Sequence, residues 1–267
     1  MNLSSQLLKT ACETALQTGK FLRTHAGRVE TRRIHTKSAN NFVTDMDRES
    51  ERLIVRSIRK KFPGHNILGE EGGRHGLGND FTWIIDPIDG TSNFIHGFPM
   101  FSISIGVTYK KKVIAGVVYD PSNQELFWAS EKKGAFLNKK RIHVSRTRRL
   151  SDAIMATGIP FRGFKRFESY MDSFKNISLG SAGIRRGGSA ALDLAHVACG
   201  RYDGYWEMGL SVWDIAAGVL LVTEAGGRVT DLRGKSSSLE TGDVLAANRA
   251  IHRETLPHTK KIPKRLR

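Results

Sequence analysis

Apolar residues recur every three or four positions over the first twenty residues, and again between residues 44 and 62. This spacing puts them on one face of a helix, so it predicts two amphipathic helices. Thr44 is the expected N-cap of the second helix, Asp47 is placed three positions on as a capping-box partner, and Pro63 stops the pattern. The chain is therefore predicted to open with a pair of helices.

The hydrophobic period then falls to two. Apolar residues alternate with small or polar ones from Phe101 to Val107, as in a β-strand with two different faces. A mostly apolar run at 113–119 leads into the turn-forming residues 120–123, and a second run returns at 125–130. We predict an antiparallel meander for this region.

Beyond about residue 145, short apolar runs alternate with longer helical patterns. Strands are predicted at 154–157 and 202–206, and helices at 167–177, 189–198 and 214–225. The whole pattern predicts an α/β protein in two halves, α+β over residues 1–145 and α/β over residues 146–267, with helices and strands in layers.

Composition places the chain among globular proteins, because 39% of its residues are hydrophobic and 25% are charged. No apolar run is long enough to span a membrane, and the first twenty residues do not have the pattern of a secretory leader, so we expect a cytoplasmic protein without membrane contact. The two cysteines, Cys12 and Cys199, lie in helical patterns and are interpreted as small apolar residues rather than a disulfide.

The charge balance is unusual, with 42 Lys and Arg against 26 Asp and Glu and a net charge of +16. The basic residues form short clusters at 110–112, 139–141 and 146–149, and a tail from Lys260 to Arg267. A solvated basic surface is one interpretation. Attraction of anionic substrates, nucleic acid or an acidic protein is the other.

Acidic residues stand at the ends of apolar elements, where a carboxylate contributes nothing to a core. They are Glu70 and Glu71, Asp86 and Asp89, and Asp214. Carboxylates that converge from strand ends are the oxygen ligands preferred by Mg²⁺. We expect Pro87 to end its strand and turn Asp86 and Asp89 toward one point, and Gly90 and Thr91 to start a helix whose free N–H groups face a phosphate.

Each of these acids also has a purely structural interpretation. Asp47 fits a capping box, Asp214 fits the N-terminus of its own helix, and Asp86 and Asp89 fit ordinary turn chemistry. If the metal-site hypothesis were wrong, each of these acids would need its own unrelated structural reason to stand where it does.

Five segments together resemble the inositol monophosphatase family, in the order and spacing that this family shows. They are Val43–Asp47, Gly69–Glu71, Asp86–Thr91, Gly188–Asp193 and Trp213–Asp214. The resemblance runs from the first helix to Asn248 and is strongest to bacterial inositol-1-monophosphatases. It implies a layered αβαβα sugar-phosphatase sandwich, usually found as a homodimer.

The resemblance also implies roles for individual residues. Metal ligands would be Glu70, Asp86, the Ile88 carbonyl, Asp89 and Asp214. Phosphate would rest on Gly90 and Thr91, and Asp47, Glu70 and Thr91 would orient the attacking water. The substrate-binding residues would be Asp89, Gly90, Thr91, Gly188, Ser189, Ala190, Glu207 and Asp214, with Glu207 on a sugar-ring hydroxyl.

The resulting hypothesis is a phosphomonoesterase that uses two or three Mg²⁺ ions and a water molecule, without a phosphoenzyme, to hydrolyse myo-inositol 1-phosphate or a related sugar monophosphate. Fructose 1,6-bisphosphate, a nucleotide-derived bisphosphate and histidinol phosphate are alternative substrates within the family. A role of another class also stays open, because close bacterial members are associated with antitermination of ribosomal RNA transcription through RNA polymerase. The sequence has no nucleic-acid recognition motif to support RNA contact.

Overall fold

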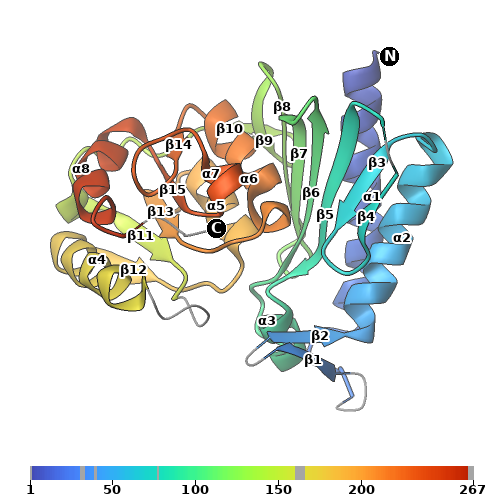
Figure 1. The fold of residues 1–267 in the computed structure, drawn as a ribbon, viewed down its shortest axis with the longest axis horizontal. Coiled ribbons are helices and arrows are strands. Elements are labelled where there is room, and N and C mark those ends of the chain that lie inside the picture. The colour runs from blue at the N-terminus through green and yellow to red at the C-terminus, as the bar shows by residue number, and fades with distance from the viewer. Residues whose placement is uncertain (1, 31–33, 39–40, 77, 160–165, 264–267) are drawn as a thin grey trace.

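In the computed structural model the protein is a stack of five layers, helices and sheets in alternation (Figure 1). The residues described are 2–30, 34–38, 41–76, 78–159 and 166–263, with no side-chain description at 36–38 and 41–42. The end of the basic tail, from Lys264, lies outside them. The expected αβαβα arrangement is confirmed.

An eight-stranded sheet dominates the first half, in the order β10-β9-β8-β7-β6-β5-β3-β4. Its strands are β3 Asn66–Gly69, β4 Gly73–His75, β5 Phe81–Asp89, β6 Ser102–Tyr109, β7 Lys112–Asp120, β8 Glu125–Ser130, β9 Gly134–Leu137 and β10 Lys140–Ile142. Every adjacent pair is antiparallel except β3 with β5, so the predicted meander is confirmed and extends to β10.

Two helices cover the outer face of this sheet, α1 (Leu3–Arg23) and α2 (Asp45–Lys61). Their buried faces meet large sheet residues such as Trp83 and Ile105. The predicted start of α2 is confirmed, since Thr44 and Asp47 form a reciprocal capping box.

A five-stranded sheet forms the second half, in the order β12-β11-β13-β15-β14. Its strands are β11 Ile154–Thr157, β12 Gly183–Arg185, β13 Gly204–Glu207, β14 Arg228–Thr230 and β15 Val244–Ala247. The strand predicted at 202–206 is therefore shifted by one or two residues.

Helices lie on both faces of the second sheet. They are α4 Phe167–Gly180, α5 Ala190–Ala198, α6 Val212–Glu224, α7 Ser238–Thr241 and α8 Arg249–Thr259. Between the two sheets, α5 and α6 bury apolar side chains against both, so one core cluster joins Val118 of β7 to Ala246 of β15. Because the two halves share this core, it does not mark a boundary between them, and the division predicted at residue 145 stays a prediction.

Some elements were not predicted from the hydrophobic pattern. Most of them are short or edge elements: the hairpin of β1 (Ile34–Ser38) with β2 (Asn41–Thr44), the strands β4, β9, β10, β12, β14 and β15, and the turn of helix α7. The 11-residue helix α8 was not predicted either. Most strands of three or four residues show too few positions for a period to appear, although the four-residue β11 was predicted as a short apolar run. No helix in the described part of the chain is long and apolar enough to cross a membrane.

Candidate active site

The strand that carries Asp86 and Asp89 does not end at Pro87, as we had expected. β5 continues to Asp89, and its pairing with β6 slips: Asp86 faces Ser104 and Asp89 faces Ser102. Three steps along β5 match two along β6, so one extra residue bulges out. In a regular strand, residues three apart point to opposite faces, and the bulge puts these two carboxylates on the same face.

A tight turn follows the bulge. Gly90 has φ +92°, and a Cβ there would lie 2.9 Å from the Met100 carbonyl oxygen and 3.2 Å from that of Gly188. Only glycine fits this position, because both the backbone angle and the space exclude a side chain. The turn starts α3 (Thr91–His96), which confirms the predicted helix.

These residues open into a cleft of about 290 Å³ between the two halves of the molecule. Of the residues predicted to be functional, ten line it: Glu70, Asp86, Ile88, Asp89, Gly90, Thr91, Gly188, Ala190, Glu207 and Asp214. The remaining two, Asp47 and Ser189, lie just behind the lining.

Asp47 combines the capping role with a contact to the cleft. Its Oδ2 accepts hydrogen bonds from the Thr44 backbone N–H and hydroxyl, and its Oδ1 accepts one from the Thr91 hydroxyl at 3.0 Å. The same Thr91 hydroxyl lies 3.1 Å from the Ile88 carbonyl oxygen. The structural and functional interpretations of Asp47 are therefore compatible.

Asp89 joins the first sheet to the second half. Its Oδ2 accepts hydrogen bonds from the Ser189 hydroxyl at 2.6 Å and from the Ala191 N–H at 2.7 Å. Ser189 is the N-cap of α5, so this carboxylate lies at the positive end of that helix.

Burial and neighbouring charges together raise the pKa of two carboxyl groups in the cleft, those of Asp86 and Asp214. Burial, followed by the charges of Glu70, Asp89, Asp214 and Asp47, raises the pKa of Asp86 well above its usual range. Burial, followed by the charge of Asp89, does the same for Asp214. A cleft of this kind favours a cation, because bound positive charge relieves both the repulsion and the burial of the anions.

Burial also raises the pKa of Asp89 to about 6, although the Ser189 and Ala191 hydrogen bonds oppose the shift. Across the cleft, burial raises the pKa of Glu207 to about 7, opposed by the hydrogen bond from the Tyr205 hydroxyl. Glu207 fills the space beside Gly158, where a Cβ would lie 2.0 Å from its Oε1.

The donor set fits a hard divalent cation. All its members are oxygens: the carboxylates of Glu70, Asp86, Asp89 and Asp214 and the Ile88 carbonyl. In the described part of the chain, no three His, Cys, Asp or Glu side chains converge closely enough to hold an ion alone. These residues would therefore bind a cation together with main-chain oxygen and water, as is usual for Mg²⁺.

Sequence reasoning missed a buried acid behind the Glu70 loop. Glu51 of α2 is 5% exposed, and its carboxylate accepts hydrogen bonds from the Glu71 N–H at 2.9 Å and the Gly72 N–H at 2.7 Å. The signal was present, because Glu51 falls on the buried stripe of α2 with Met46 and Ile54.

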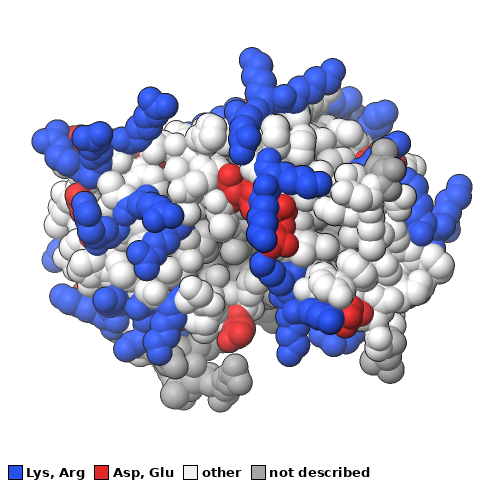
Figure 2. All heavy atoms as spheres, turned by 90° about the horizontal axis from the view of Figure 1, so that it is seen from above, with Lys and Arg blue, Asp and Glu red and all other residues white. Residues whose placement is uncertain are grey.

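Positive charge is spread widely outside the cleft. Figure 2 shows one face of the molecule, on which Lys and Arg side chains extend over both halves, while acidic side chains are fewer and most visible near the middle. The chain's excess of cations therefore lies largely on its surface.

Comparison with known proteins gives a consistent result. The family model described as "Inositol monophosphatase family" matches residues 3–264. The chain is 45% identical to the Nus factor SuhB of Pseudomonas aeruginosa over 247 residues, which cover 91% of each protein. It is 40% identical to the inositol-1-monophosphatase of Mesorhizobium japonicum over 258 residues, covering 96% of this chain and 97% of that one.

Solved structures agree with the sequence comparisons. The extragenic suppressor protein suhB of Bartonella henselae superimposes with a TM-score of 0.93 at 38% identity, covering 96% of this chain and 99% of that one. The IMPase of Thermotoga maritima does so with a TM-score of 0.88 at 37% identity, covering 96% and 97%. This chain belongs to the inositol monophosphatase family and is a phosphatase.

Proposed function

We propose that this phosphatase hydrolyses myo-inositol 1-phosphate, or a closely related sugar monophosphate, with Mg²⁺ as its cofactor. The main supporting observation is that one cleft gathers five carboxylates, four of them the proposed metal ligands, with the Ile88 carbonyl and the Gly90 turn. The 40% identity to a relative named inositol-1-monophosphatase favours this substrate.

In this proposal Glu70, Asp86, the Ile88 carbonyl, Asp89 and Asp214 would hold two or three Mg²⁺ ions. When bound, the ions would supply positive charge at the phosphate and would lower the pKa of a water molecule. The chain's own part is to hold the ligand oxygens in place. The β5 bulge turns Asp86 and Asp89 to the same face, and the Ala191 N–H of α5 donates a hydrogen bond to Oδ2 of Asp89.

Asp47 and Thr91 would orient the nucleophilic water together with Glu70. The Thr91 hydroxyl hydrogen is directed to Asp47 or to the Ile88 carbonyl, so the hydroxyl oxygen is left to accept a hydrogen bond from water. Asp47 in turn is fixed by Thr44 at the start of α2. Phosphate would lie against the Gly90 and Thr91 amides, where no side chain intrudes.

The opposite wall would receive the polyol. Glu207 carries a carboxylate into the cleft, and Gly188 and Ala190 line the same side. A carboxylate that accepts hydrogen bonds from ring hydroxyls distinguishes a polyol from a simple alkyl ester.

Phosphate release from inositol 1-phosphate, with Mg²⁺ present and then chelated, tests the proposal. We expect turnover that requires the metal. A panel with fructose 1,6-bisphosphate, a nucleotide-derived bisphosphate and histidinol phosphate ranks the alternatives, and a strong preference for a bisphosphate would replace inositol 1-phosphate as the substrate. No turnover on any ester by folded, Mg²⁺-loaded protein would contradict the proposal.

A second role, in contact with the transcription machinery or its RNA, is supported by two observations. The relative from Pseudomonas aeruginosa is named a Nus factor. In addition, a cleft of about 470 Å³ lies beside α8 and shares no residue with the carboxylate cleft, and four of its lining residues are Arg228, Arg249, Arg253 and Lys260. No ion pair joins these cations to a carboxylate within the described residues, so they are available to a polyanion.

Salt-dependent retention on ribosomal leader RNA or on RNA polymerase tests this second role. We expect the double variant Arg249→Glu/Arg253→Glu to lose retention and the Asp89→Asn variant to keep it, because the basic cleft and the carboxylate cleft share no residue. The matched control is Lys139→Glu/Lys140→Glu, which makes the same charge change on β10 and the turn before it. Equal retention by all variants would show that the cleft beside α8 does not bind RNA or RNA polymerase.

Two further expectations belong to the proposal. Homodimerisation is expected from the family resemblance and can be measured by light scattering. A cytoplasmic location agrees with both cysteines being free.

A further inference from the structure

One buried ion pair in the second half lies directly behind the wall of the carboxylate cleft. Arg166, the N-cap residue of α4, places its Nη2 2.6 Å from Oδ2 of Asp243, just before β15. The two side chains are 11% and 9% exposed, whereas the other ion pairs between described residues include at least one partner that is much more exposed. A pair so far from water requires a reason beyond surface charge.

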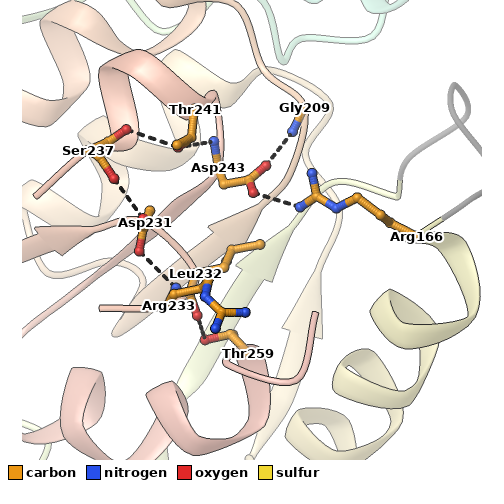
Figure 3. Close-up of polar contacts among 9 residues, drawn as sticks. All are labelled: Arg166, Gly209, Asp231, Leu232, Arg233, Ser237, Thr241, Asp243 and Thr259. Carbon is orange, nitrogen blue, oxygen red and sulfur yellow. Dashed lines mark hydrogen bonds and ion pairs between the residues drawn. The ribbon is translucent and has the colours of Figure 1, made fainter. Parts of the chain in front are cut away.

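Asp243 uses its second oxygen on the cleft wall. Its Oδ1 accepts a hydrogen bond from the Gly209 N–H at 3.1 Å, and Figure 3 shows the carboxylate lying between Gly209 and Arg166. Gly209 belongs to the run Glu207–Ser211, all of which lines the cleft. The wall is therefore tied through one carboxylate to the start of α4.

A neighbouring contact fixes the same loop. The Leu210 N–H donates to the Gly242 carbonyl oxygen at 2.8 Å, and a Cβ on Gly242 would lie 2.0 Å from the Leu210 carbonyl oxygen. The turn itself is braced, since the Asp243 N–H donates to the Thr241 hydroxyl and that hydroxyl donates to the Ser237 carbonyl (Figure 3). The wall loop rests on a turn that is stiff and closely packed.

We infer that Asp243, oriented by Arg166, is a positioning residue that sets the wall of the cleft opposite the phosphate side and thereby the affinity for the polyol part of the substrate. The inference rests on the proposed function, in which Glu207 contacts a ring hydroxyl. Glu207 pairs with Val244, the residue next to Asp243, so a shift of the turn moves the Glu207 backbone directly. Misplacing a binding group by about 1 Å costs up to roughly 100-fold in rate.

Asp243→Ala tests the inference, because it removes the acceptor for Gly209. With inositol 1-phosphate we expect KM to rise about tenfold and kcat to change much less, since the lost contact serves binding of the polyol. With p-nitrophenyl phosphate, which has no polyol, we expect both constants to stay near those of the unmodified protein. Asp243→Asn keeps an oxygen acceptor in the same place, so it should restore most of the affinity.

Hydrogen exchange gives a readout that does not depend on any substrate. The Gly209 and Leu210 amides should exchange faster in Asp243→Ala, and less so in Asp243→Asn. If inositol 1-phosphate is not hydrolysed by the unmodified protein, the proposed function fails, and the exchange result still decides whether Asp243 holds the wall. Folded Asp243→Ala with unchanged KM and unchanged exchange at these amides would overturn the inference.

The matched control is Glu125→Ala, which breaks the surface ion pair with Arg201. It should leave KM and the exchange of the wall amides unchanged. If Asp243→Ala does not fold, the double variant Arg166→Met/Asp243→Asn removes both charges at nearly constant volume. In that variant the Asn side chain has lost its anchor, so faster exchange at Gly209 supports the inference, and exchange at the unmodified rate overturns it.

Discussion

The two sides of the carboxylate cleft are built in opposite ways. The side proposed to bind phosphate comes largely from one short segment, residues 86–91, in which a glycine turn directly follows the bulge of β5. The side proposed to receive the polyol is assembled from Gly158, Gly188, the run Glu207–Ser211 and, behind them, Asp243. A contiguous segment fixes its own geometry through backbone angles, whereas an assembled wall depends on how distant elements pack.

This difference has a chemical counterpart. On the side proposed to bind phosphate, Asp86 and Asp89 share a face, and the proposed cation would offset the cost of burying their charges. On the polyol side, the buried acid Glu207 has a neutral hydrogen-bond partner in Tyr205. Changes on the first side should therefore abolish the chemistry, and changes on the second should alter affinity and stability.

The largest effect should come from Asp89→Asn. It removes one charge from the proposed metal ligands while retaining an acceptor for the Ser189 hydroxyl and the Ala191 N–H. We expect the protein to fold and its phosphatase activity to fall by more than about 100-fold. A loss of about 100-fold is already the upper end of the range for residues that only support metal ligands. Activity is measured at saturating Mg²⁺, with circular dichroism as the check on folding. A fully active, metal-responsive Asp89→Asn protein would contradict the assignment of the phosphate side.

The next effect concerns pH and the polyol side. Folding raises the pKa of Glu207 from 4.5 to about 7, so between these values the folded protein holds a proton that the unfolded chain releases. The unfolded state then binds fewer protons, and with metal chelated the free energy of unfolding should fall as pH rises from about 4.5 to about 7, by roughly 3 kcal/mol from this group.

Glu207→Gln should remove most of that contribution and flatten the profile measured by urea unfolding. Asp89, with its pKa raised to about 6, acts in the same direction and should leave a residual slope. The exposed Glu168→Gln serves as the matched control. A Glu207→Gln profile as steep as that of the unmodified protein would show that the wall acid does not titrate in this range.

A smaller effect is expected at Thr91. Thr91→Ala removes the hydroxyl that connects Asp47 to the cleft and should lower kcat by about 100-fold, the lower range for loss of a proton-handling group, with little change in Mg²⁺ affinity. Thr91→Ser keeps the hydroxyl and should retain most activity, and the neighbouring Ser92→Ala is the position control. If Thr91→Ala and Thr91→Ser have the same kcat, the Thr91 hydroxyl takes no part in the reaction.

The smallest effect should come from Glu51→Ala, because this acid supports the loop after Glu70 from behind. Loss of its two hydrogen bonds to the Glu71 and Gly72 N–H groups should weaken apparent Mg²⁺ affinity by about tenfold. Glu49→Ala, on the exposed face of the same helix, should leave the Mg²⁺ dependence unchanged. If both variants respond to Mg²⁺ like the unmodified protein, the Glu70 loop holds its shape without Glu51.

Most elements with a clear hydrophobic pattern could be predicted from the sequence, whereas the three-residue strands could not. Strands such as Ile154–Thr157 and Glu125–Ser130 were predicted with the bounds that the structure has. The three-residue strands β4, β12 and β14 show too little of any period, and they form because longer neighbours offer them a paired edge.

The sequence by itself determined which residues could build the phosphate side, because charge, turn chemistry and spacing all lie within 86–91 and the nearby Glu70. It did not determine how they are aimed: Pro87 predicted a strand end, and pairing with β6 produced a bulge instead.

The ion pair of Arg166 with Asp243 was also decided only by the tertiary structure. Each residue alone is an ordinary polar position, and 77 residues of chain separate them. Local chemistry is encoded in neighbouring residues, whereas the wall of a cleft is fixed by packing between elements that meet only when the chain has folded.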